Sequence, residues 1–148
     1  IGWQIINALE IKSKLADIER LKTEIDAQHA RIEKIAARSA FDSAVNRSYT
    51  LYKTGEHVKA FVCTLEAIEH CLKIEEYEDL DIFLNNLVAH AANSHSQYCY
   101  KSDCEEMIKI DTAIRQAPKF ALIRDRYEAA VHEYNRWFKP VIDDKKEK

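Results

Sequence analysis

In the N-terminal third of the chain, isoleucines recur every seven residues and other apolar side chains fill adjacent positions. These residues are Ile11, Ile18, Ile25 and Ile32, with Leu15, Leu21 and Ile35 beside them. The spacing predicts one apolar stripe along a helix over residues 9–38, and a strict seven-residue repeat favours supercoiling with a neighbouring helix. Two positions in each seven-residue repeat would face the neighbouring helix, and lysine, glutamine and histidine interrupt the second of them. We therefore interpret the segment as one helix of a bundle rather than a free-standing dimeric coiled coil.

The first clear turn follows at Lys53-Thr54-Gly55-Glu56. A glycine stands there where a left-handed helix C-cap is favoured, and a lysine ends the preceding helix. Apolar positions at helical spacing predict a second helix over residues 56–74 and a third that begins at residue 80. The sequence turns polar at residues 93–97, where the third helix either ends or becomes exposed. The acidic stretch 75–79 predicts a polar joint between these two helices.

Two local motifs place the remaining helices. Ser102-Asp103-Cys104-Glu105 has the form of a capping box, which predicts that a short helix begins there and ends near residue 116. Pro118 fits the first turn of a last helix, because its missing N–H costs nothing at that position. We expect Pro140 to stop this last helix after Phe138.

Composition indicates an all-helical chain. The 148 residues include two glycines and two prolines, where average usage would give roughly seventeen together. Sheet proteins need turn-forming residues every 8–12 positions or so, which excludes sandwich, barrel and Rossmann folds. The predicted fold class is all-α, an antiparallel helical bundle or stacked helical hairpins, with five to six helices and a long N-terminal helix.

Charge and hydropathy divide the chain into three predicted regions. The net charge is −3 with both signs interspersed, which indicates no nucleic-acid-binding surface. Residues 1–8 are apolar but far shorter than the roughly 20 residues that span a bilayer; they could be the end of a membrane anchor, with Trp3 at headgroup level. Residues 9–140 are expected to form one helical domain, and residues 141–148 a charged, disordered tail.

Around the first turn, the chain reads Tyr49-Thr50-Leu51-Tyr52-Lys53-Thr54-Gly55-Glu56-His57-Val58-Lys59-Ala60, with Ala67 seven residues later. This pattern resembles the middle of a tetratricopeptide repeat. In that class of repeat, small residues let two antiparallel helices approach closely, and the glycine makes the turn between them. The resemblance implies a helical hairpin over residues 41–74.

Both ends of the chain carry a second resemblance. The C-terminal part contains Arg124-x-x-Tyr127-x-x-Ala130-Val131-x-Glu133-Tyr134-Asn135, and the first long helix contains Ile25-Asp26-x-Gln28-x-x-Arg31. These two stretches resemble the last helix and the first long helix of the LemA family, in the same order. The resemblance implies a membrane-anchored four-helix bundle without known catalytic residues.

The four cysteines fall into two pairs with different expectations. Cys63 and Cys71 are eight residues apart on one predicted helix, which is too far for a mutual disulfide, so we interpret them as small packing residues. Cys99 and Cys104 flank a predicted turn and could form a disulfide if the domain is exported. Their state depends on the compartment, which the sequence does not give.

Histidines near these cysteines raise the question of a metal site. His95 and Cys99 are four residues apart, so one face of a helix could present both to a zinc ion. A structural zinc site needs two more ligands, usually from a tight C-x-x-C or H-x-x-x-H pair, and neither motif is present. We therefore expect no metal and no other cofactor.

The favoured interpretation is a non-catalytic interaction or scaffold module that contacts a protein partner. Tyrosines and tryptophans are over-represented where proteins receive partners. Polar or amphipathic side chains on helices expected to face each other mark a candidate recognition groove, formed by Asn46, Tyr49, Lys53, His90, Asn93 and Gln97. Two alternatives stay open: a metal-binding bundle or enzyme that uses His70, His95, Cys99 and Cys104, and a homo-oligomeric coiled coil led by residues 9–38.

Overall fold

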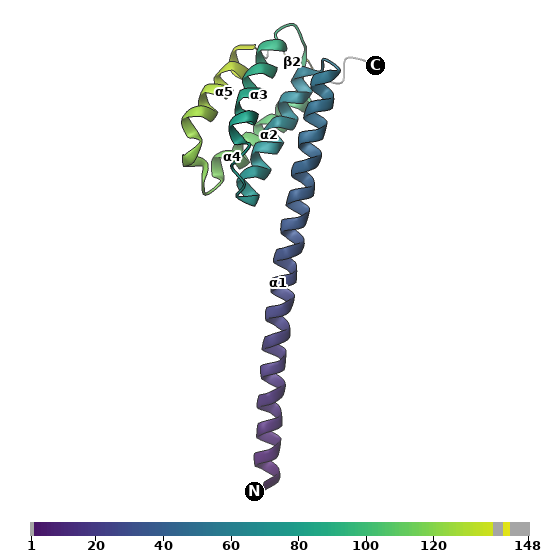
Figure 1. Cartoon of the computed structure of the whole chain (residues 1–148), viewed down its shortest axis with the longest axis vertical. Helices are drawn as coiled ribbons and strands as arrows, with labels where there is room; N and C mark the ends of the chain where they lie inside the picture. Colours follow the sequence, from purple (N-terminus) through teal and green to yellow (C-terminus); the bar gives the residue numbers. More distant parts are fainter. Residues whose placement is uncertain (1, 138–140, 143–148) are drawn as a thin grey trace. The chain divides into compact units, whose positions relative to one another are not determined.

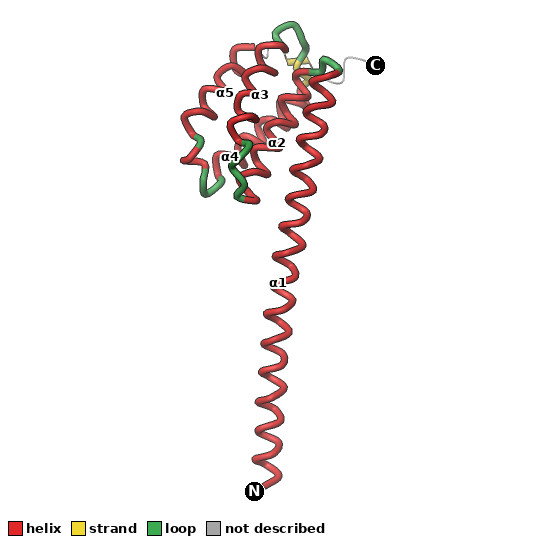
Figure 2. Tube along the Cα trace, in the orientation of Figure 1, coloured by secondary structure: helices red, strands yellow, loops and turns green. Residues whose placement is uncertain are grey.

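A computed structural model describes residues 2–137 and 141–142, with side chains described for residues 2–134. Its helices are α1 (Gly2–Lys53), α2 (His57–Ile74), α3 (Leu80–Asn93), α4 (Lys101–Gln116) and α5 (Arg124–Trp137). A short 3-10 helix, η1 (Phe120–Leu122), and two strands of two residues each, β1 (Cys99–Tyr100) and β2 (Val141–Ile142), complete this part of the chain (Figure 1, Figure 2). The predicted all-α class with a long N-terminal helix is confirmed.

The chain divides into two compact units, Ile1–Ala36 and Ala37–Lys148. The boundary therefore falls within α1, whereas the sequence places the start of a single domain at residue 9. Every residue from 2 to 36 is exposed, so the apolar stripe is not buried as the interpretation of a bundle helix requires. The physical reason is that the apolar stripe is narrow. A helix inside a bundle buries a broader apolar face than this stripe provides, because polar residues interrupt one of its two apolar positions per repeat.

The core of the second unit is built around α2. This helix packs against α3 and α4, and α3 packs in turn against α5. Ile68 on α2, Leu87 on α3 and Ile114 on α4 are fully buried. Ala60 and Ala67 on α2 are also fully buried, and their small side chains leave room for close contact between helices. Apolar residues that recur with the helical period of 3.6 residues thus account for the packing of these helices.

The two turns expected on either side of α2 are present. Gly55 has φ +80°, and its N–H donates to Tyr52 O at 3.1 Å while that of Glu56 donates to Leu51 O at 2.9 Å. A left-handed residue of this kind satisfies carbonyls at a helix end, and glycine adopts it without a Cβ penalty. Glu75 closes α2 in the same way, with φ 57°.

The last helix is anchored by a buried tyrosine. Tyr127 on α5 is fully buried, and its hydroxyl donates to Asp111 Oδ1 on α4 at 2.7 Å. Arg115, one turn further along α4, donates to Asp111 at 2.9 Å and is also bonded to Glu128 on α5. Burial raises the pKa of Tyr127, and the Asp111 carboxylate raises it further. This network fixes the position of α5 against α4.

The predicted capping box at residues 102–105 is wrong. The N-cap of α4 is Tyr100, two residues before Ser102, and it is extended and makes no side-chain cap bond; the helix itself begins at Lys101. Ser102 and Glu105 therefore lie inside the helix. The physical reason is that Cys99 and Tyr100 are held extended by pairing with β2, and this long-range contact decides where the helix starts.

The placement of Pro118 in the first turn of the last helix is also wrong. Pro118 lies in a turn that precedes η1, and α5 begins only at Arg124. Phe120 and Ile123 are both buried. The chain turns both apolar side chains toward the core through the short 3-10 segment before α5 can start.

The predicted disordered tail is corrected at its first two residues. Val141 and Ile142 form β2 and pair in parallel with Cys99 and Tyr100 of β1. Valine and isoleucine are residue types enriched in strands. The expected stop of the last helix at Phe138 and Pro140, and the rest of the tail, lie outside the described residues.

Candidate functional site

A groove lies between the C-terminal part of α1 and α3, with α2 contributing to its lining. Its cavity has a volume of about 400 Å³ and is lined mainly by apolar and aromatic surface. The lining residues are Val45, Ser48, Tyr49, Tyr52 and Lys53 of α1, Thr64 and Ala67 of α2, and Ile82, Phe83, Asn86, Ala89 and His90 of α3. We call this cavity the α1–α3 groove.

The α1–α2 side of the α1–α3 groove carries a pair of buried hydroxyls. Ser48 Oγ and Thr64 Oγ1 lie 2.7 Å apart, and Thr64 donates to Ala60 O at 2.9 Å. Both side chains are buried, so these bonds replace the water that the hydroxyls give up on folding. The edge-to-face contact of Phe41 with Phe83, with ring centroids 5.7 Å apart, holds α1 and α3 together nearby.

His90 is the unusual residue of the α1–α3 groove. Its side chain is 4% exposed, and neither ring nitrogen has a hydrogen-bond partner in the described part of the chain. Tyr52 and His57 pack around it, with ring centroids at 5.6 and 6.3 Å. Burial, with a smaller contribution from the charge of His57, lowers the pKa of His90 to about 4. His90 is therefore neutral at pH 7, with one N–H donor and one acceptor nitrogen unused.

The rim of the α1–α3 groove carries a positive charge. Lys53 Nζ lies 5.3 Å from the centre of the Tyr49 ring, in cation–π geometry. Among the described lining residues, Lys53 is the one with a full charge at pH 7. The α1–α3 groove thus combines an apolar cavity, a neutral hydrogen-bonding imidazole and a cation at its edge.

Three of the six candidate recognition residues line the α1–α3 groove: Tyr49, Lys53 and His90. Asn46 and Asn93 are exposed on the same two helices but do not line it. Tyr52 and the small hydroxyl residues of the lining were not among the candidates. Tyr52 is one helical turn from Tyr49, and that spacing is the signal that could have identified it.

Gln97 is a structural residue rather than part of the α1–α3 groove. Its Nε2 donates to Gly55 O, and its Oε1 accepts a hydrogen bond from Val58 N at 3.2 Å. The second bond satisfies a backbone N–H in the first turn of α2, which has no partner within the helix. Gln97 thereby ties the α1–α2 turn to the segment that follows α3.

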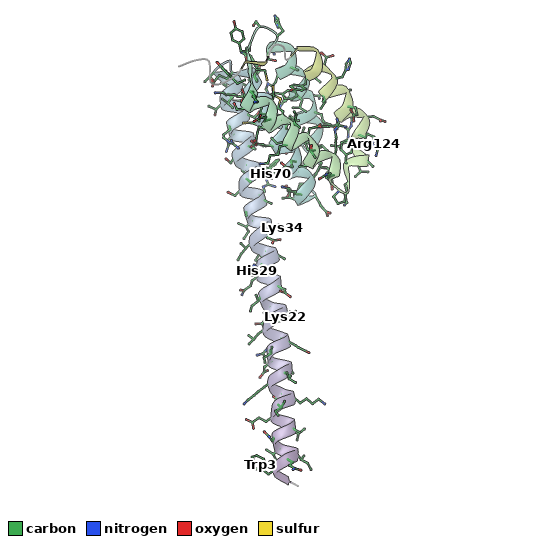
Figure 3. The ribbon with its side chains drawn as sticks, turned by 180° about the vertical axis from the view of Figure 1, so that it is seen from behind. Trp3, Lys22, His29, Lys34, His70 and Arg124 are labelled. Carbon is green, nitrogen blue, oxygen red and sulfur yellow. The ribbon has the colours of Figure 1, made fainter. Side chains whose placement is uncertain are left out.

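The helix face that could have presented His95 and Cys99 together is not formed. Helix α3 ends at Asn93, so the two residues lie in a turn and in β1. His95 Nδ1 contacts Ala92 O at 3.0 Å, while Cys99 is buried. His70, which is labelled in Figure 3, lies on α2. Within residues 2–134, no three His, Cys, Asp or Glu side chains are grouped so that they could hold a metal ion.

The structure brings Cys99 and Cys104 together, as the spacing of the two residues around β1 allows. Their Sγ atoms are 2.7 Å apart, and both are thiols. Cys63 and Cys71 are buried in α2. Burial raises the pKa of Cys63 and raises that of Cys71 to about 12, so both are poor nucleophiles at neutral pH.

Oxidation with diamide is expected to form an intramolecular disulfide between Cys99 and Cys104 and to leave Cys63 and Cys71 as thiols. The first pair already has its sulfurs adjacent, and one of its members, Cys104, is partly exposed. Cys63 and Cys71 are both buried and separated by two helical turns. Peptide mass spectrometry after tryptic cleavage at Lys101 detects the linked peptides. A Cys104→Ser variant should show no linked peptide, and a disulfide that includes Cys63 or Cys71 would contradict the assignment.

Two searches bear on membrane attachment and on relationship to known proteins. In the part of the chain that the structure describes, no helix contains an apolar stretch long enough to cross a bilayer. Comparison of the chain with protein-family models, curated proteins and solved structures found no match. The function proposed for this protein therefore depends on the chemistry of the α1–α3 groove.

Proposed function

We propose that residues 37–137 form a non-catalytic module that binds a protein partner by receiving an apolar side chain of an acidic peptide segment in the α1–α3 groove. The observation that carries this proposal is His90, a buried imidazole with two unused ring nitrogens beside an open apolar cavity. A buried polar group left without a partner costs about 1–3 kcal/mol. A bound peptide that supplies the missing partners would recover part of this cost.

The dimensions and charge of the α1–α3 groove suit such a segment. Ligand pockets typically measure roughly 300–1,000 Å³ and are mostly apolar, with a few polar groups that fix orientation. A cavity of about 400 Å³ is within this range, so it can enclose a large apolar side chain. Neutral His90 carries one N–H donor and one acceptor nitrogen, and Lys53 at the rim attracts a carboxylate.

The hydroxyls of the α1–α3 groove favour binding over catalysis. A serine nucleophile needs a base within hydrogen-bond reach. Ser48 is instead bonded to Thr64, and His90 is bonded to neither residue in the described structure. No observation favours a site built from His70, His95, Cys99 and Cys104. Membrane attachment, which the LemA resemblance and the apolar lead-in imply, stays a prediction.

Selection of a displayed random peptide library on the full chain tests the proposed function. We expect enriched peptides to carry a large apolar residue next to Asp or Glu. Ala89 is exposed at the edge of the α1–α3 groove, so Ala89→Trp should block entry and weaken the selected peptides by about tenfold or more. Lys53→Glu should weaken them through charge repulsion. Fluorescence polarisation with labelled peptides measures both effects.

Ala92→Trp provides the matched control. Ala92 is exposed on the same helix but does not line the α1–α3 groove, so this variant should bind the selected peptides with wild-type affinity. Failure to enrich any peptide would contradict the proposed function. Enriched peptides that bind Ala89→Trp as tightly as the wild type would contradict it as well, because they would occupy a different surface.

A further inference from the structure

The first unit of the chain is a helix with an unpartnered apolar stripe. The stripe residues are 50–63% exposed, from Leu21 at the lower end to Ile35 at the upper. In heptad notation, Ile11, Ile18, Ile25 and Ile32 occupy position a, and Lys14, Leu21, Gln28 and Ile35 occupy position d. Residues 9–36 thus span about four heptads, a helical length of roughly 40 Å. An apolar seam sustained over this many heptads is typical of a coiled coil.

We propose that residues 9–36 of two copies of this chain pair as a parallel, in-register coiled coil. A second copy carries the same seam, so each isoleucine at position a meets its own counterpart. Isoleucine at all four a positions combined with leucine at one d position, Leu21, favours two strands, while isoleucine at another d position, Ile35, favours three or four. Because every residue from 2 to 36 is exposed, the seam is free to meet such a copy.

Charges beside the seam determine the direction of pairing. Positions g carry Glu10, Asp17, Glu24 and Arg31, and positions e carry Leu15, Lys22, His29 and Ala36. In a parallel pair, each g side chain faces the e side chain five residues further along the other helix. Asp17 then faces Lys22 of the second copy, and Glu24 faces His29 of the second copy. An antiparallel pair would instead place g positions against each other, and three of these four positions are acidic.

The polar residues in the seam are compatible with a parallel pair. Lys14 Nζ lies 3.5 Å from Glu10 Oε1 on its own helix, so part of its charge is compensated beside the seam. Gln28 would meet Gln28 of the second copy, where two amides can hydrogen-bond to each other. Lys14 and Gln28 each meet their own counterpart in the parallel pair, and polar pairs in a seam restrict register at some cost in stability. Figure 3 locates Lys22 and His29 along this helix.

Sedimentation equilibrium of the full chain tests the proposal. We expect the wild type to form a dimer. Asp17→Lys and Lys22→Asp should each weaken dimerisation by about tenfold, because each places like charges opposite one another at two symmetric sites. An equimolar mixture of the two variants should recover wild-type affinity, because every facing pair is then Asp with Lys. Ile25→Asp should abolish dimerisation.

Thr23→Asp is the control, because Thr23 lies at the outer position f and faces away from the seam. This variant changes charge without touching the facing pairs and should leave the dimer intact. Hydrogen–deuterium exchange over α2 confirms that each variant keeps the fold of the second unit. A monomeric wild type, a trimer, or single charge variants that dimerise as well as the wild type would overturn the proposal. None of these results affects the peptide-binding test of the α1–α3 groove.

Discussion

Replacement of Ile68 by alanine is expected to lower the free energy of unfolding of the second unit by about 2–5 kcal/mol. Ile68 is 0% exposed and lies on α2, the helix that packs against both α3 and α4. Removing three carbon atoms there leaves a cavity that the surrounding helices can fill only in part. Since a domain of this size is stable by roughly 5–15 kcal/mol, the variant should lose a large share of its stability.

Hydrogen–deuterium exchange of peptides from α2 measures this loss directly. The exchange of these peptides reports the opening of the second unit, independently of residues 2–36. Ile108→Ala is the matched control, because Ile108 on α4 is 64% exposed and its truncation should change stability by no more than about 0.5 kcal/mol. Equal protection in Ile68→Ala and Ile108→Ala would show that α2 is not the centre of the core.

The helices and turns of the second unit follow from local patterns in the sequence. The apolar spacing of α2 and α3, Gly55 in the first turn and the acidic joint at residues 75–79 each place an element where the structure has it. The start of α4 could not be predicted in this way. It depends on Tyr100 being held extended by Ile142, a residue far along the chain. A capping motif is a local sequence pattern and contains no information about such a distant contact.

The α1–α3 groove was predictable only in part, for a similar reason. Tyr49, Lys53 and His90 are long or amphipathic side chains on helices that were expected to face each other. Ser48 and Thr64 are small hydroxyl residues that carry no such signal, and their contact depends on the register of α1 against α2. The role of Gln97 at the α1–α2 turn likewise arises from a fold contact and not from its neighbours in sequence.

The seven-residue repeat in α1 illustrates a different limit. The repeat correctly indicates a long helix with one apolar stripe, but a pattern on one helix does not identify the helix that covers it. Polar residues at Lys14 and Gln28 favour a bundle interpretation when they are counted as interruptions. The exposed stripe and the charges at Asp17 and Lys22 instead favour a second copy of the chain.

Acidification from pH 7 to pH 4 is expected to destabilise the wild-type second unit by about 3 kcal/mol through His90 alone. In the unfolded chain histidine titrates near pH 6.5, whereas burial in the α1–α3 groove lowers the pKa of folded His90 to about 4. Between these two values the unfolded state binds the extra proton. Stability therefore falls as the pH falls through this window and is complete above pH 6.5.

His90→Leu isolates this contribution, because leucine fills similar space and does not titrate. Burial also lowers the pKa of His70, so His70 destabilises the folded state in acid as well. This effect is the same in the wild type and in His90→Leu. At pH 7 the variant should be as stable as the wild type or more stable, since two unpartnered ring nitrogens are removed from the interior. As the pH falls to 4, the two stabilities should diverge by about 3 kcal/mol in favour of the variant.

Urea denaturation at a series of pH values, followed by exchange of peptides from α3, measures the divergence. His132→Leu is the control, because His132 is exposed on α5, and it should follow the wild-type profile. If the stabilities of the wild type and His90→Leu fell in parallel with pH, the prediction would be contradicted. His90 would then have a hydrogen-bond partner or water in solution that keeps its pKa from falling. The same variant should weaken peptides selected for the α1–α3 groove, because the imidazole that destabilises the empty groove in acid is the one proposed to orient the bound segment.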